Sequence, residues 1–78
     1  MIKKENKLVI TFHTTTEAMA MEHACKAEQA DGRLIPVPRS ISAGCGLAWC
    51  AKVESETALR ELMNKYNIQP QAVQECLV

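Results

Sequence analysis

The sequence predicts an α+β fold in which helices cover one face of an antiparallel sheet. Three observations predict it. The chain has 78 residues, which suffices for a single domain over residues 1–78. Its apolar patterns follow the order strand, helix, strand, strand, helix, strand. The connections are short, so consecutive elements must pack as neighbours. These features favour a ferredoxin-like two-layer sandwich, with a four-stranded antiparallel sheet and two helices on one face.

The first strand and the first helix are predicted from the N-terminal part of the chain. Leu8–Phe12 is a β-branched and aromatic run that is too short for a helix and suits a buried strand. Thr14, with Glu17 three residues later, has the spacing of a capping box, so we expect a helix from about Thr15 to Ala30. Asp31-Gly32 then ends the helix. Four residues share the apolar face of this helix: Ala18, Met21, Ala24 and Cys25.

The remaining elements follow from proline content and apolar spacing. The extended segment Leu34–Pro38 contains two prolines, which lack N–H donors, and this places it at a sheet edge. Leu47–Val53 is the third strand, and Glu54 and Ser55 open a second helix that Asn67 ends. The last strand is expected within Gln71–Val78. The expected inner face of the third strand consists of Leu47, Trp49, Ala51 and Val53, and that of the second helix of Leu59, Leu62, Met63 and Tyr66.

This topology has a consequence for function. The loop between the second and third strands lies at the same end of the sheet as the exit of the first strand and the start of the first helix. We therefore expect His13, Thr14 and Thr15 to lie near the loop that contains Arg39 and Cys45.

Composition excludes several classes of function. Nine basic and nine acidic residues give a formal net charge of zero, so the chain has no field to attract nucleic acid or an anionic membrane. No stretch approaches the roughly 20 apolar residues of a membrane span. The polar start Met1–Lys7 does not resemble a signal peptide. We therefore expect a cytoplasmic protein with free thiols and with neither nucleic acid nor membrane as a partner.

Cys45 is the candidate reactive residue. It stands between Gly44 and Gly46, and glycines allow the positive φ angles that point successive N–H groups at an anion. Arg39 and the positive end of the first helix would lower the pKa of a thiol in this loop. Such a site would also accept a persulfide or selenide on Cys45. The alternative is a tight turn in which the glycines serve geometry only.

The other cysteines are assigned more passive roles. Cys50 is expected to be a structural residue lining the sheet, with a resolving thiol as the alternative. Cys25 lies on the apolar face of the first helix and is assigned to the core, while Cys76 has no activating neighbour in the sequence.

Metal and cofactor sites are not supported by spacing. Cys45 and Cys50 form the only close pair, and zinc domains present two such pairs, so no metal site is expected from the cysteines with His13 and His23. Gly44-Cys45-Gly46 lacks the further glycine of a dinucleotide fingerprint, and no phosphate-binding loop occurs. We expect no cofactor.

The loop sequence resembles a known family. Ile35-Pro36-Val37-Pro38-Arg39, Ile41-Ser42 and Cys45-Gly46-Leu47-Ala48 are similar to the signature of the putative selenium/sulfur carrier protein-like family. The resemblance covers most of the chain and places the family's single motif cysteine on Cys45. It implies a ferredoxin-like fold and a carrier role, in which Cys45 holds reduced sulfur or selenium for a downstream enzyme.

Two hypotheses of function follow, with a third as a further alternative. The first is a carrier rather than a turnover enzyme: Cys45 takes a sulfur or selenium atom from a donor enzyme as a persulfide or selenopersulfide and passes it to an acceptor enzyme. Arg39, Gly44, Gly46 and the start of the first helix would stabilise the anion. The second is a non-catalytic binding or homodimerisation module that uses the open sheet face, with Cys45 as a turn residue. The third is a redox-sensing thiol.

Overall fold

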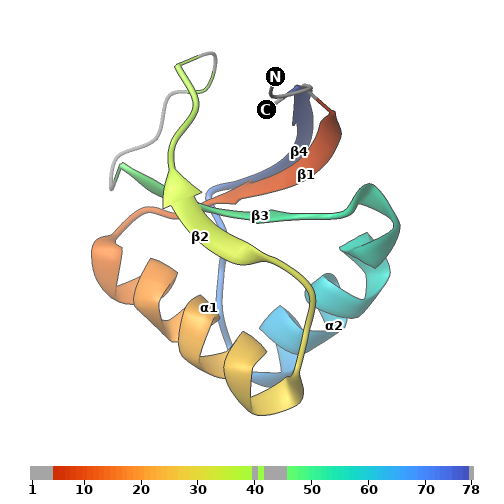
Figure 1. Cartoon of the computed structure of the whole chain (residues 1–78). Coiled ribbons are helices and arrows are strands. Elements are labelled where there is room, and N and C mark those ends of the chain that lie inside the picture. Colours follow the sequence, from red (N-terminus) through yellow and green to blue (C-terminus); the bar gives the residue numbers. More distant parts are fainter. Residues whose placement is uncertain (1–4, 40, 42–45, 78) are drawn as a thin grey trace.

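The computed structural model of the chain describes residues 5–39, 41 and 46–77. Figure 1 shows a sheet with both helices packed beneath one face. The elements in chain order are β1 (Asn6–Thr11), α1 (Thr15–Glu28), β2 (Arg33–Pro36), β3 (Leu47–Ala51), a single 3₁₀ turn (Val53–Ser55), α2 (Glu56–Lys65) and β4 (Ala72–Leu77).

The sheet has four strands in the order β2-β3-β1-β4, and every neighbouring pair is antiparallel. The two longest strands, β1 and β4, pair along their whole length, while β3 lies between β1 and β2. The expected segment with the two prolines is indeed an edge strand. This order, with two helices on one face, confirms the α+β ferredoxin-like sandwich.

The first helix begins where the capping box predicts and ends earlier than expected. The backbone N–H of Glu17 donates to Thr14 Oγ1 over 3.2 Å, so Thr14 is the N-cap of α1. The expected end near Ala30 is wrong, because Gln29 adopts a left-handed conformation with φ 56°. Its N–H turns back to the carbonyls of Cys25 and Lys26, as at many helix ends.

Two expected core positions are also corrected. Val53 does not share the inner face of β3, because the strand ends at Ala51 and Val53 opens the 3₁₀ turn. Tyr66 is 39% exposed at the end of α2, where its hydroxyl donates to Glu28 Oε2 over 2.7 Å. Ile68, which follows the helix, is buried instead.

The core fills the space between the sheet and the helices. Alternate residues of β1 point into it, and Trp49 of β3 joins them at 3% exposure. Trp49 is therefore a core residue, as its place on the expected inner face of the third strand predicts. The buried cluster consists of Leu8, Ile10, Phe12, Ala18, Met21, Ala24, Cys25, Trp49, Ala51, Leu59, Leu62, Met63 and Ile68.

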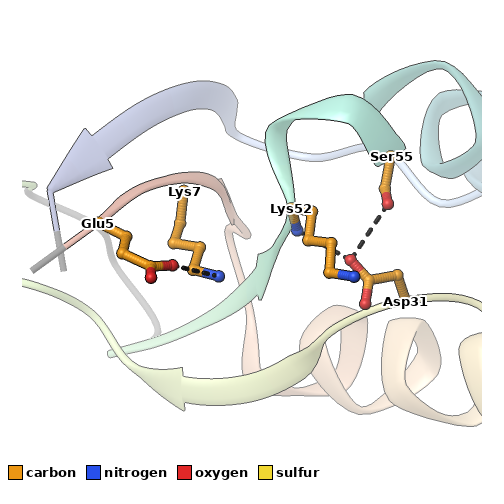
Figure 2. A network of polar contacts seen from close by, with 5 residues as sticks. All are labelled: Glu5, Lys7, Asp31, Lys52 and Ser55. Carbon is orange, nitrogen blue, oxygen red and sulfur yellow. Dashed lines mark hydrogen bonds and ion pairs between the residues drawn. The ribbon is translucent and has the colours of Figure 1, made fainter. Parts of the chain in front are cut away.

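The corner between α1 and β2 is held by Asp31. Its carbonyl oxygen accepts from the indole Nε1 of Trp49 over 3.0 Å. Its carboxylate oxygen Oδ2 accepts from the backbone N–H of Lys52 over 2.8 Å and from the Ser55 hydroxyl over 3.1 Å (Figure 2). The Lys52 N–H bond is the main reason that the pKa of Asp31 lies below its usual value. These bonds tie the corner to the turn after β3.

The face of the sheet without helices is partly covered as well. Val9, Thr11 and Ala48 project from this face, since they alternate with the core residues of β1 and β3, and yet none is more than 1% exposed. Figure 1 shows the chain after β2 rising on this side of the sheet. The half-buried residues Val37 and Ile41 belong to that segment.

Thr11 provides a test of how this covered face is packed. Its side-chain oxygen is buried, and no hydrogen bond to it occurs within residues 5–39, 41 and 46–77. Replacing Thr11 with valine keeps the shape and removes the buried hydroxyl, so we expect the free energy of unfolding to stay the same or rise by about 1 kcal/mol. Urea denaturation of both proteins measures it. A loss of more than about 1 kcal/mol would show that the hydroxyl is hydrogen-bonded.

Candidate functional site

The β2–β3 connection and the start of α1 lie at the same end of the sheet. Thr11, the last residue of β1, pairs with Ala48 near the start of β3. Pro36, the last residue of β2, pairs with Leu47. The backbone N–H of Val37 donates to the carbonyl of Gly46 over 3.0 Å and extends this pairing by one step. The topological expectation for this end of the sheet is therefore confirmed.

The β1–α1 connection presents three polar residues. His13, Thr14 and Thr15 are all exposed. The Thr14 hydroxyl is engaged within its own capping box, where it also lies 3.3 Å from a carboxylate oxygen of Glu17. The backbone N–H groups of Thr15 and Thr16 donate to no other described residue. The positive end of α1 therefore lies at this connection, where the carboxylate of Glu17 offsets part of its field.

The β2–β3 connection begins with a turn. The backbone N–H of Ile41 donates to the carbonyl of Pro38 over 2.9 Å, and Arg39 lies exposed within this turn. At the other end of the connection, Gly46 has a φ of +77° and is exposed. A glycine adopts this angle without strain, as expected of the glycines beside Cys45.

Cys45 and Gly44 lie outside the described residues, so their assigned roles stay predictions. Among the residues that are described, no hydrogen bond or ion pair joins His13, Thr14 or Thr15 to Arg39 or Gly46. The structure thus brings the two segments to one end of the sheet without a hydrogen bond or ion pair between those five described residues.

The three described cysteines are free thiols in different environments. Cys25 lies in the core at 1% exposure, and burial raises its pKa to about 11. Its assignment to the core is confirmed. Cys50 is half-buried on the helix-free face of β3, and burial raises its pKa despite the nearby cations Lys7 and Arg33. It lines the sheet, as expected. Cys76 is half-buried on β4.

Cys50 and Cys76 are too far apart to form a disulfide. They lie on β3 and β4, which flank β1 on either side. Strands two positions apart are separated by about 10 Å, whereas the Cα atoms of a disulfide lie within about 7 Å. The resolving role considered for Cys50 concerns Cys45, which lies outside the described residues, so that role stays a prediction.

Thiol alkylation should rank these cysteines. Because the thiolate is the reacting species, we expect Cys25 in the native protein to be modified by iodoacetamide at least about a hundredfold more slowly than Cys76, since both its raised pKa and its burial oppose reaction. Peptide mass spectrometry over a time course at pH 8 measures the rates. Equal rates would contradict the packing of α1 described above, and unfolding in urea should remove the difference.

No helix within the described part of the chain is long and apolar enough to cross a membrane. Residues 5–39, 41 and 46–77 also contain no group of three or more histidine, cysteine or acidic side chains placed to hold a metal ion. His13 and His23 are both exposed.

One cluster was not found from the sequence. A pocket of about 270 Å³ opens beside Cys50 and is lined by the basic residues Lys7, Arg33 and Lys52 together with Asp31. These residues come from three separate segments of the chain. Only the register of the strands, with Arg33 opposite Cys50 and Cys50 opposite Val9, brings them together.

Comparison with known proteins gives one match. A family model described as "Putative Se/S carrier protein-like" matches residues 7–75, a range that includes Cys45 and nearly the whole fold. No curated protein and no solved structure matches the chain.

Proposed function

The chain belongs to the putative Se/S carrier protein-like family, and on this basis we propose that it carries sulfur or selenium on Cys45. The match over residues 7–75 is the observation that carries the proposal, because it spans the whole β2–β3 connection and its only cysteine. In the proposed cycle, Cys45 holds reduced sulfur as a persulfide, or selenium as a selenopersulfide, and hands it to a partner enzyme.

The proposed transfer is an exchange at sulfur. The Cys45 thiolate attacks the outer sulfur of a persulfide on the donor enzyme, forming a new S–S bond on Cys45. The S–S bond on the donor breaks, and the donor leaves as a thiolate. Delivery repeats the exchange, with the acceptor's thiolate attacking the outer sulfur on Cys45. No net oxidation occurs in either step, so the carrier needs no cofactor of its own.

Exposed groups around the connection would support the anionic form of Cys45. Arg39 lies exposed in the turn that opens the connection, and Gly46 closes it with a φ that favours inward-pointing N–H groups. The backbone N–H of Gly44 is assigned the same role. A cation and backbone donors both lower the pKa of a neighbouring thiol, and a lower pKa raises the fraction of the nucleophile at neutral pH.

The start of α1 would contribute from the same end of the sheet. The N–H groups of Thr15 and Thr16 lie at the positive end of a 14-residue helix. His13 and Thr14 lie beside them and are exposed. We assign His13, Thr14 and Thr15 to the reception of the chalcogen anion or of the partner's loop, in agreement with their placement relative to β2 and β3.

The partners in this proposal are a donor enzyme and an acceptor enzyme. A persulfide lasts only where its exchange with other thiols is controlled. A cytoplasmic location keeps thiols reduced, and this suits a protein with free thiols at Cys25, Cys50 and Cys76. The binding or homodimerisation module is the less supported candidate, since Trp49 is buried in the core and Val9 and Ala48 are already covered.

The proposal is tested by supplying the purified full chain with a cysteine desulfurase and sulfur-labelled cysteine. We expect label to become bound to the protein and to be released by dithiothreitol, as persulfide sulfur is. Selenocysteine in place of cysteine tests the selenium arm, because the desulfurase then carries the outer selenium as a selenopersulfide that Cys45 can take over by the same exchange. If the chain takes up no label under conditions that load a known carrier, the carrier proposal fails and the module remains.

A further inference from the structure

The basic pocket beside Cys50 lies on the helix-free face, away from the β2–β3 connection. Arg33 of β2 lies directly opposite Cys50, which lies opposite Val9 of β1. Lys7 is two residues before Val9 and therefore shares this face. Lys52, which directly follows β3, also lines the pocket, together with Asp31 and Gly32.

The charges of the pocket are unbalanced. Asp31 is the acidic residue of its lining, and its Oδ2 already accepts hydrogen bonds from the Lys52 backbone and the Ser55 hydroxyl (Figure 2). Arg33 forms no ion pair with any described residue. Lys7 pairs with Glu5 over 3.2 Å, and this carboxylate is 61% exposed, so the pair is weak and easily exchanged. Three cations thus line a pocket whose lining holds one carboxylate, Asp31, and a second carboxylate, Glu5, pairs with Lys7 from outside that lining.

Clustered like charges destabilise a fold unless an anion lies between them. The sheet register holds Arg33 and Lys7 on either side of Cys50, and both cations act on this thiol to lower its pKa against the effect of burial. A pocket of about 270 Å³ accommodates a small ion with its water, and a guanidinium with two ammonium groups offers the donors that such an ion needs.

We propose that the pocket of Lys7, Arg33 and Lys52 binds a small tetrahedral oxyanion of the sulfate or phosphate type beside the Cys50 thiol. The bound ion neutralises the clustered charge at this end of β1 and β3. The site is separate from Cys45 and does not depend on the carrier proposal, because it uses only residues of the pocket.

Charge-selective alkylation of Cys50 provides the test. For each thiol, we divide the alkylation rate with anionic iodoacetate by the alkylation rate with neutral iodoacetamide. This ratio reports the electrostatic potential at the thiol, because the thiolate fraction is the same in both reactions and cancels. At low ionic strength we expect this ratio at Cys50 to exceed that of free cysteine. Arg33→Gln should lower it about threefold, the effect of one unit charge about 7 Å away in water. Arg33→Lys keeps the charge and should leave the ratio close to that of the unchanged protein. Arg60→Gln on α2 is the matched control and should not change the ratio at Cys50.

Binding itself is followed by amide NMR of the full chain. Titration with sodium sulfate, and separately with sodium phosphate, against sodium chloride of equal ionic strength should give saturable shifts at Lys7, Gly32, Arg33 and Lys52. We expect Arg33→Gln or Lys7→Gln to weaken binding about tenfold. Shifts that do not saturate, or that are equally weakened by Arg60→Gln, would overturn the site, as would a Cys50 ratio equal to that of free cysteine.

Discussion

Replacing Gly32 with alanine is expected to destabilise the fold by about 4 kcal/mol. The reason lies in the corner between α1 and β2. An alanine Cβ at this position would lie 2.7 Å from the backbone oxygen of Cys50 and would clash with the indole nitrogen of Trp49. Both neighbours are fixed, since Cys50 belongs to β3 and Trp49 is 3% exposed.

Three contributions make up this expected loss. The φ of +117° at Gly32 is strained for any side chain, which costs about 1–3 kcal/mol. Displacing the indole costs a further 1–3 kcal/mol in overpacking. It also breaks the bond from Trp49 to the Asp31 carbonyl, worth about 1 kcal/mol. A chain of this length has a total stability of about 4–12 kcal/mol, so the variant should keep only about 0–8 kcal/mol and unfold at a much lower urea concentration.

Gly46→Ala is the matched control for this prediction. Gly46 also has a positive φ, but apart from its chain neighbours no heavy atom of the described residues would lie within 4 Å of a Cβ there. We expect this change to cost only about 1 kcal/mol, the backbone term alone. Urea denaturation followed by circular dichroism measures both variants. If Gly32→Ala costs no more than Gly46→Ala, the close packing of the corner against Trp49 is wrong.

Replacing Cys45 with serine is expected to abolish chalcogen loading without loss of fold. Serine keeps the size of the side chain but cannot form an S–S or S–Se bond under these conditions. Because the change replaces a single sulfur atom with oxygen, we expect the melting temperature of Cys45→Ser to stay close to that of the unchanged protein. Loading should fall to the background seen without a donor enzyme.

The other thiols supply controls for this variant. Cys50→Ser and Cys76→Ser change half-buried residues on the sheet, and both variants should load as the unchanged protein does. Loading that persists in Cys45→Ser and disappears in Cys50→Ser would move the carrier thiol to the helix-free face. The chain would then still be a carrier, but the carrier thiol would be Cys50 and the assignment to Cys45 would be wrong.

Local patterns in the sequence predict most of the fold. The capping box at Thr14 marks the start of α1, and the two prolines of Leu34–Pro38 indicate an edge strand, since each effect acts within a few residues. The end of α1 was predicted less well, because the left-handed Gln29 is not distinguished by composition. Tyr66 fits the apolar spacing of α2, yet it lies past the last helical turn and bonds Glu28 instead.

Features that depend on distant pairing could not be predicted in the same way. Lys7, Arg33 and Lys52 are separated by some twenty residues each and meet only because the register places β2 and β1 on either side of Cys50. The Asp31 carboxylate likewise finds its partners at Lys52 and Ser55 through the sheet order. By contrast, the placement of His13 and Arg39 at one end of the sheet follows from the order of elements alone, and it was predicted.

Peptide-resolved mass spectrometry of the unchanged protein after loading tests the central proposal most directly. All four thiols compete for chalcogen in the same sample, and each lies in a different proteolytic fragment or is separable by fragmentation. We predict the mass of one added sulfur or selenium on the peptide that contains Cys45, with Cys25 unmodified and little addition at Cys50 or Cys76. Chalcogen distributed over Cys50 and Cys76, or absent from Cys45, would contradict the assignment of this residue as the carrier.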